Sequence, residues 1–244
     1  MNSYDYSIYY RNWHDDSPEH LKHEAYVKAN QIRDHLKLPT ESRILDVGCG
    51  FGFALGGLRL LGFHNISGVE QSVQQAEVCR RAGFEVDVTD DTIGWLQTRP
   101  ASYDAILLFD VLEHVPVRIQ IDFVRGIHKA LKPGGKLILT VPNANSILAS
   151  RWLYNDYTHH SSFTEHSLAF VLKNAGFQQI WLDNSKGIGR FPRWALRRKR
   201  YWNLIRKWLI RWCWLQVFKA EHAFEPVDNI CFELNLTATA TKDI

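Results

Sequence analysis

The sequence predicts an α/β fold in which a mostly parallel, doubly wound sheet carries helices on both faces. Short apolar runs alternate with amphipathic stretches along most of the chain, and this order gives parallel pairing with right-handed crossovers. The apolar run at 44–47 then breaks into Gly48, Gly50 and Gly52, and Glu70 closes the next apolar run. A glycine turn after the first strand and an acid after the second mark the ligand-binding end of such a sheet.

Proline, glycine and helix-capping residues mark the ends of the elements in the first part of the chain. Pro39 and Gly62 each follow a helical stretch, Ser72 is a suitable N-cap, and Gly83 ends the helix that Ser72 begins, because these residue types favour helix boundaries. We therefore expect helices at 19–36, 53–62 and 73–81, and strands at 43–47, 65–69 and 84–88.

The second part continues the alternation and then departs from it. Strands are expected at 105–109 and 136–141, with a helix between them that ends at the turn 132–135. After Pro142 the pattern is less regular. Thr164 is a suitable cap for a helix at 165–175 that Gly176 ends. An extended run at 177–183 and an alternating closing strand at 231–241 complete the expected elements.

The 244 residues fit one α/β domain with an elaboration, and the apolar content of 45% is sufficient for a packed core. We expect an N-terminal lid and helix at 1–40, a ligand-binding core at 41–185, a basic aromatic helical insert at 186–229 and the closing strand at 230–244. The lid is assigned to 9–13, for which packing against the first helix is the alternative.

Cysteine usage and hydropathy exclude several classes. The four cysteines, at positions 49, 79, 213 and 231, have no metal-ligand spacing and form no secreted disulfide framework. The first residues lack the basic and apolar segments of a secretory signal, and no apolar run is long enough to cross a bilayer. We therefore expect a cytoplasmic protein without a metal site.

Four separate segments resemble the class I S-adenosylmethionine-dependent methyltransferases. The run Ile44-Leu45-Asp46-Val47-Gly48-Cys49-Gly50-Phe51-Gly52 is similar to the first motif of that family, Gly68-Val69-Glu70-Gln71-Ser72 to the second, and 103–115 to the fourth, while 131–139 matches the turn and strand that follow. Together they span about 40–185 in the family's order. A nicotinamide-binding fold is the competitor for the glycine loop, but it needs a third glycine at position 53, where this chain has Phe53.

The resemblance implies a Rossmann-like, seven-stranded sheet whose last strand is antiparallel, and S-adenosylmethionine as cofactor. The glycines let the loop approach the methionine part of the cofactor, Asp46 orients the loop or accepts from the cofactor's amine, and Glu70 holds the ribose hydroxyls. Asp90 is expected near adenine, although Asp90 or Asp91 is equally suited to cap a helix. The expected cofactor residues are Asp46, Gly48, Cys49, Gly50, Phe51, Gly52, Glu70, Gln71, Asp90, Phe109 and Asp110.

The segment 156–164, Asp-Tyr-Thr-His-His-Ser-Ser-Phe-Thr, is the clearest indication of the acceptor. It resembles a segment of family members that modify sugars, lipid-linked glycans and quinone precursors. We expect His159, and after it His114, to remove the acceptor proton, since histidine titrates near neutrality. The alternatives are that His159 only shapes the loop by bonding Asp156, that His114 only begins a helix, and that the acceptor needs no protein base.

The insert has a charge of its own. Residues 186–219 contain eleven bases and no acid, which leaves 18 bases against 26 acids elsewhere, and five of the nine tryptophans lie here. On a helical projection Tyr201, Leu204, Ile205, Trp208, Trp212 and Leu215 share one side, opposite Lys199, Arg200, Asn203, Arg206, Lys207 and Arg211. Such a helix fits the surface of an anionic membrane through 190–219. A face that covers the sheet or a homodimer partner, and single-stranded RNA, are the alternatives, with nucleic acid disfavoured by the insert's hydrophobicity.

The sequence thus predicts a methyltransferase, peripheral on the inner membrane face, that O-methylates a glycan, lipid-linked glycan or related amphipathic acceptor by in-line displacement. RNA or small-metabolite methylation is the alternative among enzymes. A catalytically inactive cofactor-binding module is the alternative outside them, although the cofactor motifs at positions 46, 48, 50 and 70 are intact.

Overall fold

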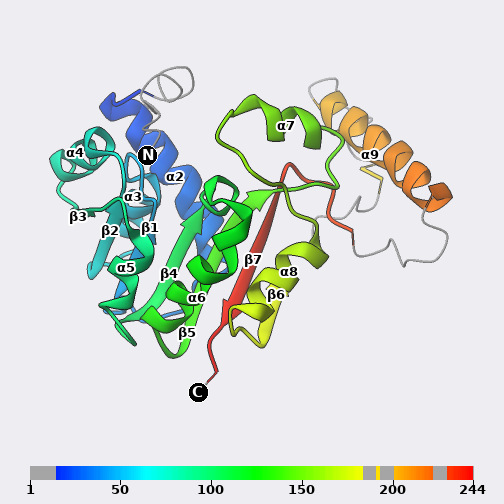
Figure 1. Cartoon of the computed structure of the whole chain (residues 1–244). Coiled ribbons are helices and arrows are strands. Elements are labelled where there is room, and N and C mark those ends of the chain that lie inside the picture. The colour runs from blue at the N-terminus through cyan, green and yellow to red at the C-terminus, as the bar shows by residue number, and fades with distance from the viewer. Residues whose placement is uncertain (1–14, 184–190, 193–200, 222–229, 244) are drawn as a thin grey trace.

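The centre of the molecule is a seven-stranded sheet in the order β3-β2-β1-β4-β5-β7-β6 (Figure 1). The computed structural model describes residues 15–183, 191–192, 201–221 and 230–243. The first five strands in this order pair in parallel, and β7 pairs antiparallel with both β5 and β6. The predicted sheet and its antiparallel last strand are therefore confirmed. The strands are β1 Ile44–Val47, β2 Ile66–Glu70, β3 Glu85–Val88, β4 Tyr103–Phe109, β5 Leu131–Pro142, β6 Gln179–Leu182 and β7 Asn235–Thr241.

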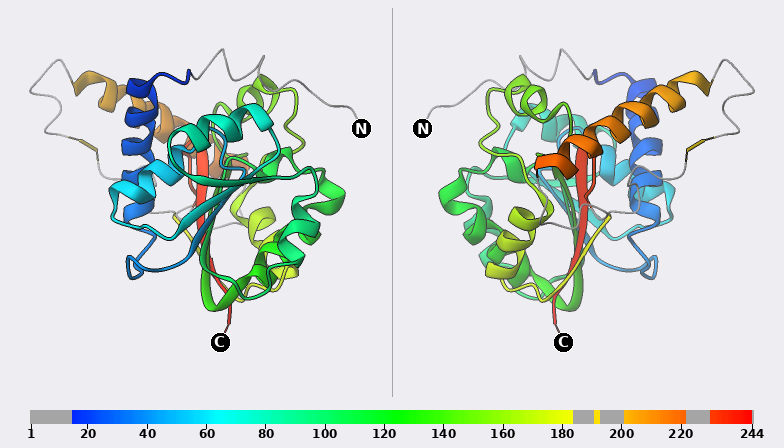
Figure 2. Two further views of the ribbon diagram at one scale, coloured as in Figure 1. Left: turned by 90° about the vertical axis from the view of Figure 1, so that its left-hand side faces the viewer. Right: turned by 90° about the vertical axis from the view of Figure 1, so that its right-hand side faces the viewer.

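Helices cover both faces of the sheet, as the alternation of strand side chains requires. Leu45 and Leu108 point into one apolar cluster, with α5, α6 and α8, whereas Ile44 and Leu107 point into the other, with α2, α3 and α4. Both layers are visible in the two side views of Figure 2. The helices are α2 Pro18–Arg33, α3 Phe53–Leu60, α4 Val73–Arg81, α5 Thr92–Gln97, α6 Gln120–Ala130, α7 Ala149–Asn155, α8 Glu165–Asn174 and α9 Trp202–Glu221, with 3-10 turns η1 Leu112–His114 and η2 Val117–Ile119.

Two predicted helix caps are confirmed, and the start of one strand differs. The Ser72 hydroxyl accepts from the Gln75 amide at 3.4 Å, and Thr164 forms a capping box with Ser167. The predicted turn at 132–135 lies inside β5, which begins at Leu131 and shifts register against β4 there. Between Leu131 and Lys136, β5 has three residues more than the paired segment of β4. These extra residues form a bulge, after which the strand resumes its pairing. The short helix α7 has no cap signal and was not expected.

The insert between β6 and β7 contains the 20-residue helix α9, none of whose residues is buried. Arg211 forms a double hydrogen bond with Glu233 at 2.6 and 2.5 Å, Lys207 lies 3.4 Å from the same carboxylate, and the Trp214 indole donates to the Asn145 carbonyl at 3.0 Å. The expected division into two faces therefore differs in the structure, because Glu233 turns two of the bases toward the protein.

Several large apolar side chains of α9 are exposed. Trp202, Leu204, Leu209, Ile210, Trp212 and Val217 are each between 43% and 57% exposed. Within the described residues, no helix combines the length and the hydropathy of a membrane span. Trp202, Leu209 and Trp212 share the side of the helix opposite Lys207 and Arg211, and we call these three side chains the outer face of α9. The predicted lid at 9–13 and the bases at 186–190 and 193–200 lie outside the described residues.

Candidate active site

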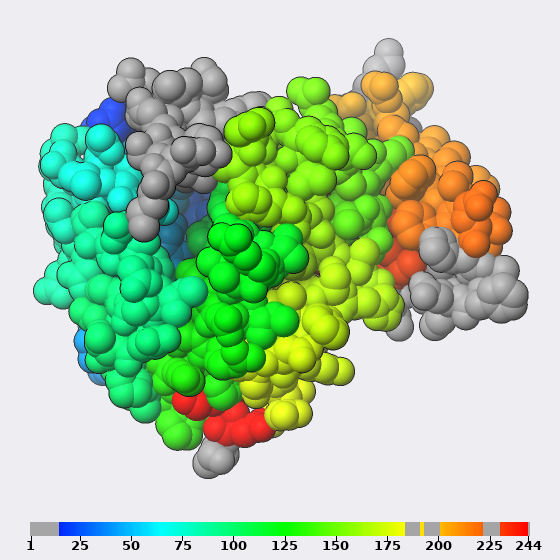
Figure 3. All heavy atoms as spheres, viewed as in Figure 1, coloured from blue at the N-terminus to red at the C-terminus, as the bar shows by residue number. Residues whose placement is uncertain are grey.

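The predicted cofactor residues of the glycine loop, Glu70 and Asp110 gather at the carboxyl ends of three neighbouring strands. The glycine loop follows β1, Glu70 ends β2 and Asp110 follows β4, and these strands are adjacent in the order β2-β1-β4. In the space-filling view, this end of the sheet is a hollow between the cyan and the green parts of the chain (Figure 3). Ligands of open α/β sheets bind at this position, where the strand order reverses.

The glycine loop requires glycine at two positions, for the same two physical reasons. Gly48 has φ +71°, and a Cβ there would lie 2.6 Å from Val111 Cγ2. Gly52 has φ +81°, and a Cβ there would lie 2.6 Å from Cys79 Sγ. The φ values favour glycine, and the close neighbours leave no room for a side chain. The side chain of Cys49 packs into the core beside Cys79, so only the backbone of this predicted residue remains available to a ligand.

The Glu70 carboxylate is the organising acceptor of the loop. One oxygen accepts from the Gly50 amide at 2.8 Å, and the other accepts from the amides of Gln71 and Ser72, also at 2.8 Å. Hydrogen bonds to an ionised carboxylate are the stronger class. Glu70 therefore fixes the position of the glycine loop relative to β2, and it does so from the strand tip where the sequence predicts ribose binding.

Asp46 is a buried carboxylate beneath the same loop, only 2% exposed. Burial raises its pKa to about 7, the positive charge of Lys28 opposes the rise, and Glu70 adds to it. Among the described residues, none donates a hydrogen bond to the Asp46 carboxylate. A carboxylate in this state is stabilised by a nearby cationic ligand group.

Asp110 stands at the mouth of β4 in the left-handed backbone region, with φ +57°. Its carboxylate accepts from the Thr140 hydroxyl at 2.9 Å and from the Asn235 amide at 3.3 Å, and it lies 3.4 Å from the Lys28 ammonium. Lys28 also lies 4.8 Å from the centre of the Phe109 ring. A non-glycine residue with positive φ is strained unless its surroundings hold it, and here three elements do so. Sequence reasoning missed Lys28, because no local signal shows which face of α2 meets the mouth of β4.

The structure shows which of Asp90 and Asp91 caps the following helix. The Asp91 carboxylate accepts from the Gly94 amide at 2.9 Å and caps α5. Asp90 is exposed beside it, so capping does not occupy its side chain. Gln71 is also exposed, directly after Glu70. Phe51 leaves the loop to contact the Phe53 ring, with 6.0 Å between the ring centres.

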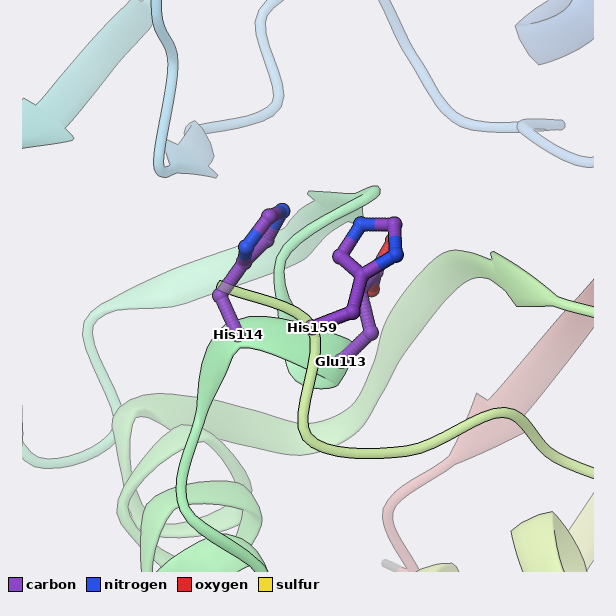
Figure 4. A group of neighbouring side chains, drawn as sticks. All are labelled: Glu113, His114 and His159. Carbon is purple, nitrogen blue, oxygen red and sulfur yellow. The ribbon is translucent and has the colours of Figure 1, made fainter. Parts of the chain in front are cut away.

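His114 and His159 come together although 45 positions separate them in the chain. Their ring centres are 4.7 Å apart, and Figure 4 shows both rings rising from their loops on the same side, with Glu113 beside His159. The local geometry results from short polar links: the Thr158 hydroxyl donates to the Asp156 carboxylate at 2.6 Å, and the His160 amide donates to the Glu113 carbonyl at 2.7 Å. The two histidines that the sequence predicts thus belong to one cluster.

The hydrogen bonds decide which nitrogen of each ring carries the proton. His159 Nδ1 lies 3.1 Å from the Trp152 carbonyl, which only accepts, so Nδ1 is the donor and Nε2 holds the lone pair. His114 Nδ1 lies 2.8 Å from the Thr158 hydroxyl, whose own proton is directed to Asp156, and the same assignment follows. Burial and the neighbouring His159 lower the pKa of His114 to about 4, so His114 is neutral at pH 7 and a weak base.

Glu113 completes the cluster and was not among the predicted site residues. It is 2% exposed, and burial, with the nearby charge of Asp110, raises its pKa well above the usual range. Its Oε2 is buried without a hydrogen-bond partner among the described residues. The ligand atoms of Glu113, His114 and His159 lie within 4.8 Å of one another. Two imidazoles and a carboxyl group at this spacing suit either proton transfer or a divalent cation.

A protein-family profile described as a methyltransferase domain matches residues 20–182. This range contains strands β1 to β6, the glycine loop, and the cluster of Glu113, His114 and His159, but not β7. The chain belongs to this family. It is a class I S-adenosylmethionine-dependent methyltransferase. A relative of known function, the ubiquinone biosynthesis O-methyltransferase of Xanthomonas axonopodis pv. citri (strain 306), is 31% identical over 183 residues, which cover 68% of this chain and 75% of the relative.

Solved structures show the same fold at lower identity. An S-adenosylmethionine-dependent methyltransferase from Archaeoglobus fulgidus superposes with a TM-score of 0.68 at 18% identity, covering 98% of this chain and 100% of the other. Phosphoethanolamine N-methyltransferase 2 from Haemonchus contortus, in complex with S-adenosylmethionine, gives a TM-score of 0.62 at 17% identity, over 100% of this chain and 61% of the other.

The residues of this methyltransferase fit its cofactor, S-adenosylmethionine. The buried Asp46 carboxylate matches an ammonium group in charge, and the Glu70 carboxylate stands at the strand tip next to the glycine loop, where it accepts from the Gly50 amide. Asp90 and Asp110 lie at the ends of the two strands on either side, β3 and β4.

Replacing Asp46 with asparagine is expected to remove a pH-dependent cost to stability. The unfolded pKa is the ordinary 3.8 and the folded pKa is about 7, so the folded state binds a proton that the unfolded state has lost between these values. The free energy of unfolding therefore falls as pH rises from 4 to 7. In urea unfolding, we expect the stability gained by Asp46→Asn over the wild type to be about 2–4 kcal/mol larger at pH 8 than at pH 5. An equal difference at both pH values would contradict the assignment.

Proposed function

We propose that this methyltransferase transfers a methyl group to a hydroxyl of an amphipathic acceptor, with His159 as the base that receives the hydroxyl proton. The observation that carries the proposal is the anchored His159 ring, which leaves Nε2 as its proton-accepting atom beside His114. The name of the Xanthomonas relative, an O-methyltransferase of ubiquinone biosynthesis, supports an oxygen acceptor.

The chain's own groups divide the work. Glu70, Asp46, Asp90, Phe109, Asp110 and the loop glycines bind and orient the cofactor, which supplies an electrophilic methyl group when bound. Holding the two reactants in line is the larger part of such catalysis. His159 Nε2 then takes the proton of the acceptor hydroxyl, while the Trp152 carbonyl keeps the ring oriented through Nδ1. His114 stays neutral, because burial lowers its pKa to about 4, and it positions the His159 ring.

A phenolic head group is the preferred acceptor, and a glycan hydroxyl is the second candidate. A phenol has a pKa of about 10, which a neutral imidazole can deprotonate during transfer far more readily than it can a sugar hydroxyl. The polar loop at 156–164 remains compatible with a sugar. RNA and small hydrophilic metabolites are further alternatives, and so is an inactive cofactor-binding module.

The test is transfer of a tritiated methyl group by the purified protein to matched acceptors. We expect transfer to a catechol that carries an alkyl chain, less transfer to a lipid-linked glycan, and none to an RNA transcript. Binding of the cofactor in calorimetry without transfer to any of them would favour the inactive module. Loss of transfer in EDTA that Mg²⁺ or Zn²⁺ restores would assign the Glu113, His114 and His159 cluster to a cation and overturn the role of His159 as base.

We also propose that the outer face of α9 attaches the protein to an anionic membrane on its cytoplasmic side. The exposed apolar side chains, among them Trp202 at 57% and Leu209 at 46%, cost free energy in water, and residues 186–219 of the insert contain eleven bases and no acid. Each base near an anionic surface contributes roughly 1 kcal/mol. A helix that lies in the membrane interface has this arrangement: its apolar side chains enter the headgroup region, and basic residues lie nearby.

Flotation with vesicles tests this attachment. We expect the full-length protein to float with vesicles of phosphatidylcholine that contain 30% phosphatidylglycerol, less so in high salt, and Leu209→Lys to float at least tenfold less. Leu148→Lys is the matched control, since Leu148 is 45% exposed but lies outside α9. Equal flotation of wild type and Leu209→Lys would exclude the outer face. A dimer in sedimentation that Leu209→Lys dissociates would assign the outer face to a second copy.

A further inference from the structure

A cavity of about 1130 Å³ lies between α2, α9 and the strands β6 and β7. None of the predicted cofactor residues lines it. In the right-hand view of Figure 2, α9 and α2 stand around β7 at the upper end of this strand. We call this cavity the α2–α9 groove. Its volume is slightly above the usual range of small-molecule sites, about 300–1,000 Å³.

Exposed apolar side chains of separate elements converge on this groove. Val27 of α2, Ile147 and Leu148 after β5, Trp181 of β6, Ile210 of α9 and Leu234 before β7 all line it, and each is between 38% and 52% exposed. Scattered apolar side chains need no explanation, but a group of them along one concave surface marks a binding site.

Several polar groups that line the groove already have partners inside the protein. Glu233 is paired with Arg211 and Lys207, the Trp214 indole donates to the Asn145 carbonyl, and the Asn235 amide donates to Asp110. A polar wall that is satisfied internally offers no specific hydrogen bond to a ligand, and binding there must come from apolar burial. The part of the groove beside these groups therefore suits an uncharged hydrocarbon chain. The other polar side chains of the lining include Asn30, Gln31, Asp34, Asn203 and Arg206.

The groove shares a wall with the mouth of the active site. Asn235 lines the groove while its side chain touches Asp110, and Lys28, which pairs with Asp110, follows Val27 of the groove along α2. On the other side, the segment with Ile147 and Leu148 leads through α7 to His159. A chain in the groove thus lies next to the loops that carry the reacting groups.

We propose that the α2–α9 groove holds the hydrocarbon chain of the acceptor, and this inference rests on the proposed O-methylation. The head group then lies at the His159 cluster, and the chain runs along the faces of α2 and α9. Chain length determines affinity in this arrangement. Each methylene contributes about 0.8 kcal/mol on burial, so two further carbons tighten binding roughly tenfold.

The first test measures binding without any transfer. The full-length protein is titrated with cis-parinaric acid, a fluorescent polyene fatty acid, which is then displaced by 1-alkanols of six to twelve carbons. We expect displacement constants to fall roughly tenfold for each two carbons. Leu148→Lys should weaken displacement at least tenfold, and Leu209→Lys, equally exposed but outside the groove, should leave it unchanged. Constants that do not depend on chain length, or equal losses in both variants, would overturn the proposal.

The second test separates this inference from the proposed function. With catechols of increasing alkyl length, we expect KM to fall with length in the wild type and to lose this dependence in Leu148→Lys, while the affinity for the cofactor stays the same. Transfer with a KM independent of length would refute the groove and leave O-methylation intact. Chain-dependent binding of alkanols without transfer to any catechol would refute O-methylation of phenols and confirm the groove as a hydrocarbon site.

Discussion

Glu70→Ala is expected to weaken binding of S-adenosylmethionine at least 100-fold. The carboxylate accepts three backbone N–H groups, from Gly50, Gln71 and Ser72, and so fixes the glycine loop. Bonds to a charged acceptor contribute about 1.5–3 kcal/mol each, and we expect the predicted ribose contacts of Glu70 to be lost with them. Isothermal titration calorimetry of the purified protein measures the dissociation constant directly.

The control for this variant is Glu77→Ala, on the exposed side of α4, which removes the same charge without touching the loop. We expect Glu70→Gln to lie between the two, because an amide keeps one acceptor oxygen and loses the charge. An unchanged dissociation constant in Glu70→Ala, in a protein whose circular dichroism is that of the wild type, would mean that the cofactor does not bind at this loop.

His159→Asn is expected to lower kcat by about 10²–10³, within the usual contribution of a positioned general base. Asparagine keeps a side-chain donor near the Trp152 carbonyl but has no lone-pair nitrogen to accept the acceptor's proton. Steady-state kinetics with an alkyl catechol at pH 8 measures this effect.

Variants of two neighbouring histidines, His160 and His114, are the controls for His159→Asn. His160 is exposed and joins the cluster only through its backbone amide, so His160→Asn should retain activity. His114→Gln should cost about tenfold, because His114 positions the ring of His159, and burial already lowers the pKa of His114 to about 4. If His114→Gln abolished transfer and His159→Asn did not, the proton would have to leave through His114.

Local chemistry explains which parts of the fold could be predicted from the sequence. Glycines, prolines and N-caps act within a few residues, so most element ends and the glycine loop were predicted from their own neighbourhoods. The start of β5 was not, because residues 132–135 read as a turn and only the pairing of β4 with β5 shows them to be a bulge. The side of α9 that meets the protein depends on Glu233, which lies beyond the helix in the chain.

The same limit applies to the site. Glu70 and the glycines belong to a short pattern, and the pairing of β1 with β2 brings them together. Asp110, in contrast, is held by Lys28, Thr140 and Asn235 from three other elements, and no pattern in the sequence links these positions. The sequence pattern indicated both histidines but gave no reason for them to lie close together, and it gave no role to Glu113.

The position of β7 determines when the sheet can be completed during synthesis. This strand sits between β5 and β6 and supplies the antiparallel partner of both, although it follows both of them in the chain. Until residues 235–241 emerge, the nascent chain presents two open strand edges at the same place, and such edges are prone to pair with other chains. α9 lies between β6 and β7 in the chain, so its apolar side chains are made before β7 fills the place between β5 and β6. We expect chaperones to bind the nascent chain most strongly at that stage.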